Sequence, residues 1–226
     1  NTTKNLQIKI KKTVSLELPN ETKISDFLFT KEKLLLATNN GLFELDYSDA
    51  ETKIYAQSLR RVQSLKDIKI LTIKKFENVY WIGTNNGIFI GQSQGNDFKI
   101  IKHYKKQDFE IQDQFPFVIF SILLDDSGTH WFGTRHHGLV KYDLKNDEFT
   151  KFQYNPKNPN GISSTFIYSV FQDNFDVIWL GTAQGGINKL DLHQKPFFNY
   201  QSNPFIKNSI SGDLITSILE DSNGYL

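Results

Sequence analysis

The chain has 226 residues, of which 38% are hydrophobic and 14% aromatic; this is enough to bury a core and excludes wholesale disorder. Its 26 basic and 25 acidic residues leave a formal charge of +1, which argues against nucleic acid as the main partner, because phosphate binding needs a concentrated basic surface. There is no cysteine for a disulfide or thiolate metal site, and no apolar run approaches the roughly 18 residues of a membrane span, so we expect no membrane contact by this segment.

The beginning of the chain predicts short strands. Residues 6–10 and 14–18 alternate apolar and polar side chains, and Pro19-Asn20 ends that run. Four further strands are then expected at Ile24–Phe29, Leu34–Thr38, Leu42–Tyr47 and Lys53–Ala56. Asn39-Asn40-Gly41 separates the middle two with residues that accept positive φ, as a tight hairpin requires.

The same order of four strands recurs three times. In the second unit the strands are expected at 68–73, 79–84, 87–90 and 98–104; in the third at 117–124, 129–134, 138–144 and 149–154; in the fourth at 165–172, 177–182, 186–192 and 197–200. Four short antiparallel strands per repeat are typical of a propeller blade, and no segment shows a helical period. The sequence therefore predicts an all-β fold, a β-propeller of four-stranded antiparallel blades.

One fourteen-residue stretch, IWLGTAQGGINKLD from Ile178 to Asp191, marks the repeat. Weaker copies begin at His130, Tyr80 and Leu34. The threonines that end the second strand of each copy are spaced by 46, 50 and 48 residues, at Thr38, Thr84, Thr134 and Thr182. A strand-rich repeat of that length indicates a propeller.

A fifth unit begins near Ser209. Ile119, Ile167 and Ile215 are separated by the same offset of 48 residues, and Leu226 occupies the place of Ile178. The repeat units of this single domain are expected at about 20–58, 66–105, 115–154 and 163–202, with an incomplete unit at 210–226. About four and a half blades are therefore expected, as part of a seven-bladed ring of roughly 340 residues. The alternative is a closed four-bladed ring that residues 6–18 complete, which leaves residues 213–226 without a role.

A tryptophan and a glycine recur in each second strand except the first. The pairs are Trp81 with Gly83, Trp131 with Gly133, and Trp179 with Gly181. Residues two apart in a strand share one face, so we interpret each pair as a structural motif and expect an aromatic side chain of a neighbouring blade to cover the glycine. Leu35 and Ala37 replace the pair in the first unit, which should pack differently.

The strand-turn-strand motif, the Asp-Ser-Asn-Gly turn at 221–224 and the Asn155-Pro156 linker closely resemble the two-component regulator propeller repeat. The resemblance implies the periplasmic sensor region of a hybrid histidine kinase, with recognition of an oligosaccharide and signalling through a homodimer of the full-length protein. It implies no cofactor and no catalysis by this segment. The resemblance identifies no ligand-binding residues in this chain, because the repeat motif itself has a structural role.

The sharpest departure between copies is Arg135-His136-His137, in the turn that Asn39-Asn40 and Asn85-Asn86 occupy elsewhere. A histidine pair beside an arginine is a candidate binding site for a carboxylated sugar or a metal. Adjacent turn residues rarely point at one ion, however, so we predict no metal site. The alternative interpretation is a polar, solvent-exposed turn.

Two other functions remain open. One is an enzyme on the same scaffold, such as a lyase that uses His136 or His137, or a glycosidase-like protein. Asp126-Ser127-Gly128 resembles the turn-stabilising Asp box of sialidases, but the chain has just three arginines for a substrate carboxylate, and its recurring aspartates follow the repeat instead of pairing. The other is a pure protein-interaction propeller with a flat apolar face.

Overall fold

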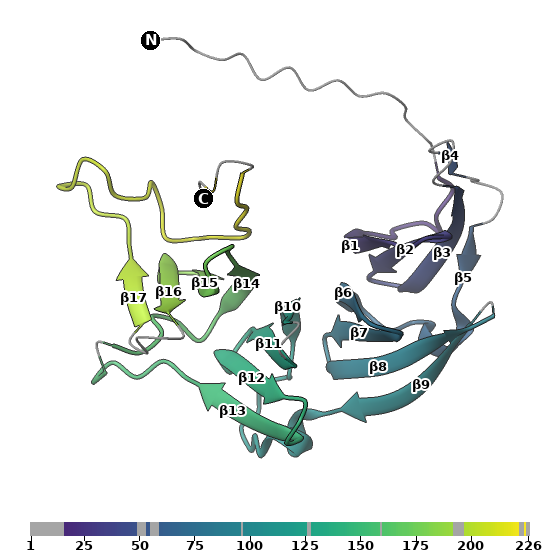
Figure 1. Cartoon of the computed structure of the whole chain (residues 1–226), viewed down its shortest axis with the longest axis horizontal. Helices are drawn as coiled ribbons and strands as arrows, with labels where there is room; N and C mark the ends of the chain where they lie inside the picture. The colour runs from purple at the N-terminus through teal and green to yellow at the C-terminus, as the bar shows by residue number, and fades with distance from the viewer. Residues whose placement is uncertain are drawn as a thin grey trace, which may run out of the picture.

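The computed structural model describes residues 16–48, 53–54, 59–95, 97–125, 128–158, 160–191, 197–221 and 224. The predicted strand at 6–10, the end of the one at 53–56, Asp126-Ser127 of the Asp-box turn, and part of the turn at 221–224 lie outside these ranges. Four antiparallel sheets stand as blades in an arc around a common centre (Figure 1). The β-propeller prediction is confirmed.

Blades 2 to 4 are meanders whose strands follow one another outwards in chain order, and blade 1 does the same in its first four strands, with its fifth strand paired to the third (Figure 1). Blade 1 consists of β1 (Ile24–Phe29), β2 (Lys33–Thr38), β3 (Gly41–Ser48), β4 (Lys53–Ile54) and β5 (Arg60–Arg61). Blade 2 consists of β6 (Ile70–Phe76), β7 (Val79–Thr84), β8 (Gly87–Gln94) and β9 (Asp97–Tyr104). Blade 3 consists of β10 (Ile119–Leu124), β11 (Thr129–Thr134), β12 (Leu139–Asp143) and β13 (Glu148–Phe152). Blade 4 consists of β14 (Ile167–Gln172), β15 (Val177–Thr182), β16 (Ile187–Asp191) and β17 (Phe197–Tyr200).

The predicted second strands of blades 2 to 4 coincide with β7, β11 and β15, because each is bounded by turn residues and buried on both faces. The prediction of a strand at 14–18 is wrong in its described part. Residues 16–18 form no strand; Leu16 and Leu18 instead pack by their side chains against Leu34, Leu36, Phe43 and Leu45 of blade 1. The two-residue strand β5, which pairs with β3, was not predicted.

The main core clusters lie between successive blades. Trp81 of blade 2 packs against Phe132 and Tyr142 of blade 3, and Trp131 of blade 3 packs with Ile178 and Leu180 of blade 4. The innermost strands β1, β6, β10 and β14 contact one another in that order. The second strands β7 and β11 therefore bury one face against the preceding blade and the other against the next, which is why both faces carry apolar side chains.

The glycine of the motif is a contact point between blades, but the prediction that an aromatic side chain covers it is wrong. An ideal Cβ on Gly83 would lie 2.8 Å from Ile119, one on Gly133 would lie 3.0 Å from Ile167, and one on Gly181 would lie 2.7 Å from Ile215. The covering residue is the isoleucine that starts the next repeat, because the innermost strand is closest to that position.

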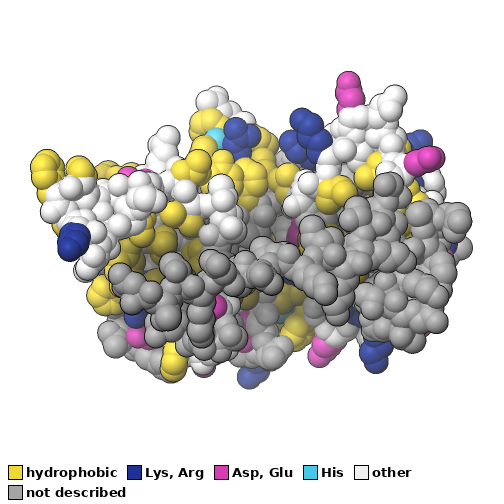
Figure 2. Space-filling view, turned by 90° about the horizontal axis from the view of Figure 1, so that it is seen from above, with side chains coloured by type: hydrophobic (Ala, Val, Ile, Leu, Met, Phe, Trp, Pro, Cys, Tyr) yellow, Lys and Arg dark blue, Asp and Glu magenta, His cyan; other side chains and the backbone are white. Residues whose placement is uncertain are grey.

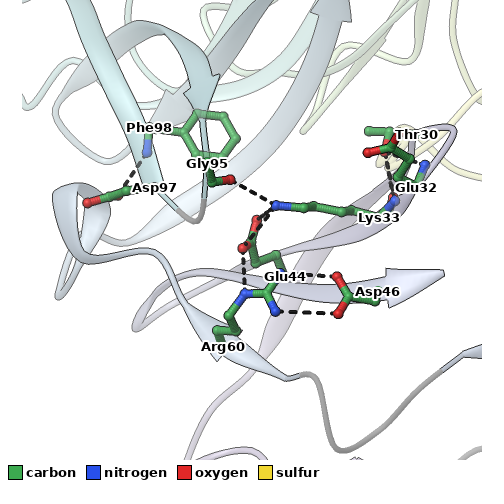
Figure 3. A network of polar contacts seen from close by, with 9 residues as sticks. All are labelled: Thr30, Glu32, Lys33, Glu44, Asp46, Arg60, Gly95, Asp97 and Phe98. Carbon is green, nitrogen blue, oxygen red and sulfur yellow. Dashed lines mark hydrogen bonds and ion pairs between the residues drawn. The ribbon is translucent and has the colours of Figure 1, made fainter.

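Blade 1, as expected, packs differently from the others. Glu44 of β3 is 1% exposed and lies opposite Leu35, in the register position that faces a tryptophan in the other blades. Its carboxylate is bonded by Lys33 Nζ at 3.1 Å and Arg60 Nε at 2.8 Å, and Arg60 also pairs with Asp46 (Figure 3). A buried carboxylate needs such partners, so this ionic network replaces the tryptophan packing of the other blades.

The start of the fifth repeat unit contacts blade 4. The Ile215 amide donates to the Thr182 carbonyl at 2.8 Å, and the Gly186 amide donates to the Asp213 carbonyl at 3.1 Å. The second bond has counterparts in the other blades, from Gly87 to Phe117 and from Gly138 to Thr165. Residues 209–221 contain no assigned strand, and the number of blades in a complete ring stays a prediction.

The two ends of the arc carry exposed apolar side chains. Phe27 and Phe29 of β1 are 57% and 50% exposed, and Tyr200 of β17 is 47% exposed. On the face that Figure 2 shows, apolar side chains reach the surface over several regions, whereas basic and acidic side chains are scattered among them. Among the described residues, no helix is both long and apolar enough to traverse a bilayer.

Candidate functional site

The turn that carries Arg135, His136 and His137 joins β11 to β12, and its shape is set by Thr134. The Thr134 hydroxyl donates to the Gly138 carbonyl at 2.7 Å and accepts the His137 amide at 2.9 Å. Thr182 closes the equivalent turn of blade 4 in the same way. The recurring threonine is therefore a turn-closing residue, and the side chains between Thr134 and Gly138 are free to differ from blade to blade.

His137 is buried and holds a neighbouring connection. Its side chain is 1% exposed, and its Nε2 lies 2.9 Å from Oδ2 of Asp113, in the segment that links β9 to β10. Lys106 Nζ lies 3.0 Å from the other carboxylate oxygen of Asp113 and also donates to backbone carbonyls of Asp113 and Phe115. His137 thus anchors the segment between blades 2 and 3 to the turn.

The electrostatics of this anchor favour a neutral imidazole. Burial lowers the pKa of His137, and the nearby carboxylate of Asp113 opposes that shift without reversing it. Burial acts to raise the pKa of Asp113, but the hydrogen bonds from Lys106 and from the Phe115 amide leave it below its ordinary value. Neutral His137 then donates from Nε2 to an ionised carboxylate, and its buried Nδ1 has no partner among the described residues.

His136 and Arg135 lie nearer the surface. The His136 ring stacks on Phe115, with centroids 4.6 Å apart, and meets Phe166 edge-on at 4.7 Å. Burial and the charge of Arg135 lower the pKa of His136. Arg135 itself is exposed. The alternative prediction of a solvent-exposed turn therefore holds for Arg135, is half right for His136 and is wrong for His137.

The structure does not bring the two imidazoles to one point. Their ring centroids are 6.4 Å apart with planes at 81°, and each ring has separate partners. In the described part of the chain, no three His, Cys, Asp or Glu side chains form a group that could hold a metal ion. At the surface this cluster presents the exposed side chains of Arg135 and Phe115, with the half-buried His136 stacked on Phe115.

Sequence reasoning missed Asp113, Lys106 and Phe115, the partners that determine where the histidines point. These three belong to the connection between blades 2 and 3, whose residues differ from the Asn-Pro linkers before blades 4 and 5. That departure from the repeat was the available signal. It identifies the connection as unusual, but only the fold brings the connection to the β11–β12 turn.

Comparison with known families supports the resemblance predicted from the sequence. Residues 161–184 match the family described as "Two component regulator propeller". This segment runs from the linker before β14 through β15 and includes Trp179, Gly181 and Thr182. No curated protein sequence matches the chain.

Several solved structures share the fold. The extracellular domain of a B. thetaiotaomicron protein, described as a hybrid two component system, aligns with a TM-score of 0.69 at 18% identity. The alignment covers 94% of this chain and 26% of the other, so the chain spans about a quarter of its relative's length. A protein from Lactobacillus plantarum aligns with a TM-score of 0.56 at 12% identity, covering 80% of this chain and 55% of the other. At these identities the likeness concerns the fold.

Proposed function

We propose that this chain is a sensor propeller of a two-component system, located outside the cytoplasm, which recognises an oligosaccharide. The observation that carries the proposal is the match of residues 161–184 to the two component regulator propeller family. The shared fold with an extracellular domain of that class of system supports the same class and the periplasmic or extracellular location.

Binding without catalysis is the function that the histidine cluster supports best. His137 is occupied by Asp113, and His136 is enclosed between Phe115 and Phe166. Both side chains therefore serve to shape and hold a surface. We infer that signalling proceeds by a change in the arrangement of a homodimer, since a ligand shifts such an equilibrium when it binds one arrangement more tightly.

A glycan array tests the proposal directly. The protein is expected to bind at least one oligosaccharide, and sedimentation velocity with that oligosaccharide is expected to show a changed association state. Binding without a change of association state would leave recognition intact and remove the dimer step. If no glycan binds and the association state never changes, the proposed function is wrong.

A further inference from the structure

A groove on the opposite edge of the blades from the histidine turn has the features of a binding site. It lies between blades 2 and 3 and has a volume of about 410 Å³, within the range of roughly 300–1,000 Å³ that ligand sites occupy. The hairpin of β6 and β7 borders it on one side, and the turn between β12 and β13 borders it on the other. We call it the blade 2–3 groove.

Blade 2 also extends beyond blade 3. β8 and β9 have 8 residues each, whereas β12 and β13 have 5 each. The outer face of blade 2 is therefore only partly covered by its neighbour. Ile101 and Leu144, which line the uncovered part from the two sides, are 51% and 41% exposed.

A β-bulge presents Ile101 to this space. Along the β8–β9 pair, Ile90 is opposite Lys102 but Gly91 is opposite Ile100, so Ile101 has no partner residue. The outer strand pairs of blades 3 and 4 keep a regular register. A bulge bends the strand and redirects a side chain, and bulges are frequent beside binding sites.

A polar cluster completes one wall of the groove. The hydroxyls of Tyr104 and Tyr142 donate to Oδ1 of Asp147 at 3.1 and 2.8 Å, and they lie 3.1 Å from each other. Lys102 Nζ stands 4.1 Å from the centre of the Tyr104 ring and 3.6 Å from Oδ2 of Asp147. The two tyrosines hold Asp147 through Oδ1. Within the described residues, the other oxygen, Oδ2, has only the Lys102 ammonium at 3.6 Å as a partner, and it can therefore accept further hydrogen bonds.

The charge state of the cluster suits an acceptor role. The hydrogen bonds from Tyr142 and Tyr104 lower the pKa of Asp147, so this carboxyl is ionised at neutral pH. Burial, together with Asp147, raises the pKa of Tyr142, so that hydroxyl keeps its proton. The groove thus combines a fixed carboxylate acceptor, a half-exposed ammonium donor and apolar walls.

At the corresponding interface between blades 3 and 4, the described strand positions are apolar where this one has tyrosines. Phe152 and Leu190 occupy the positions of Tyr104 and Tyr142, as the equivalent strand registers show. Both interfaces contain a buried hydrophobic cluster, so two blades can pack against each other without a tyrosine pair. A polar cluster that packing does not require, set in a groove, is a feature of a ligand site.

We propose that the blade 2–3 groove binds one sugar ring of the oligosaccharide, with its apolar face against Ile101 and Leu144 and its hydroxyls on Asp147 and Lys102. A pyranose matches this surface because it has carbon-bound hydrogens on one face and hydroxyls that both donate and accept. The assignment rests on the proposed function and adds the location and the residues of the site.

Variants that fill the groove or change its acceptor test the assignment. Leu144→Arg blocks the groove from an exposed position, and Asp147→Asn keeps the left-handed backbone at φ 53° that asparagine tolerates while removing the charge. Phe175→Ser is the control, because Phe175 is an exposed apolar residue in a turn of blade 4, between β14 and β15, and does not line the groove. Circular dichroism melting establishes that each variant is folded.

Binding is measured by titration calorimetry with the oligosaccharides that the glycan array identifies. Leu144→Arg is expected to abolish binding, Asp147→Asn to weaken it about tenfold or more, and Phe175→Ser to leave it unchanged. If the parent protein binds and both groove variants bind equally well, the groove assignment is wrong and the proposed function stands. If the parent protein binds none of the glycans, the proposed function and the groove assignment fail together.

Discussion

The interface between blades 2 and 3 and the interface between blades 3 and 4 follow one plan and differ in their lining. In both, a tryptophan packs into the next blade and a motif glycine receives the isoleucine that starts the next repeat. The first is lined by His130, Tyr142 and Tyr104, whereas the second has Ile178, Leu190 and Phe152 at those positions. The shared contacts hold the propeller together, and the differing residues give each interface its own chemistry.

The largest expected change in stability comes from the motif glycines, which both interfaces share. Gly83→Ala and Gly133→Ala each place a Cβ within 3 Å of atoms of the same and the next blade, and each should lower the free energy of unfolding by about 2 kcal/mol. Urea denaturation measures both. Gly212→Ala is the control, because nothing lies within 4 Å of its Cβ, and it should change stability by less than about 0.5 kcal/mol. Equal effects at positions 83 and 133 support one plan, whereas an effect at only one of them contradicts it.

A smaller effect is expected from His130, which is fully buried where the other interface has Ile178. Neither ring nitrogen makes a hydrogen bond of good geometry within the described residues. Burial lowers the pKa of His130, although the backbone of Thr129 and the charge of Asp125 oppose this shift. His130→Ile should therefore raise the free energy of unfolding by about 1 kcal/mol at pH 7, since it removes an unsatisfied buried group.

The same substitution should also change the pH dependence. A histidine with a lowered pKa in the folded state contributes full stability above the unfolded pKa of about 6.5, and this stability is lost as the pH falls towards the folded pKa. The parent protein should thus lose stability between pH 7 and pH 5, and His130→Ile should lose less. Denaturation curves at several pH values measure both slopes, and identical slopes would contradict a buried neutral His130.

The smallest effect on stability is expected from converting one interface into the other. The double variant Tyr104→Phe with Tyr142→Leu carries the residues of the blade 3–4 interface, and its free energy of unfolding should stay within about 1 kcal/mol of the parent. Chemical denaturation checks this value. A loss of several kcal/mol would mean that the tyrosine cluster is part of the scaffold, which removes the reason to regard it as a site.

Much of the fold was predictable because the residues that form each strand and turn lie next to one another within one repeat unit. The second strands of blades 2 to 4 were predicted at their observed bounds, since Thr134 and its equivalents end each strand and a positive-φ glycine follows. The identity of the residue that covers Gly133 was not predictable from its neighbours, because Ile167 belongs to the next repeat. The candidate site was predicted only in part: Arg135 and His136 are near the surface, but Asp113, the partner of His137, comes from a connection with no repeated pattern.

The sequence by itself determined the class of fold, the period of the blades and the resemblance to the two-component regulator propeller, because a repeated pattern of strands and turns is local and is read within one unit. The tertiary structure decided which residues meet between units. It buried His137, and it placed Tyr104 of blade 2 beside Tyr142 and Asp147 of blade 3. Such contacts join residues of different repeat units. The bulge at Ile101 likewise arises from how β8 pairs with β9, so the residues of one strand alone do not reveal it.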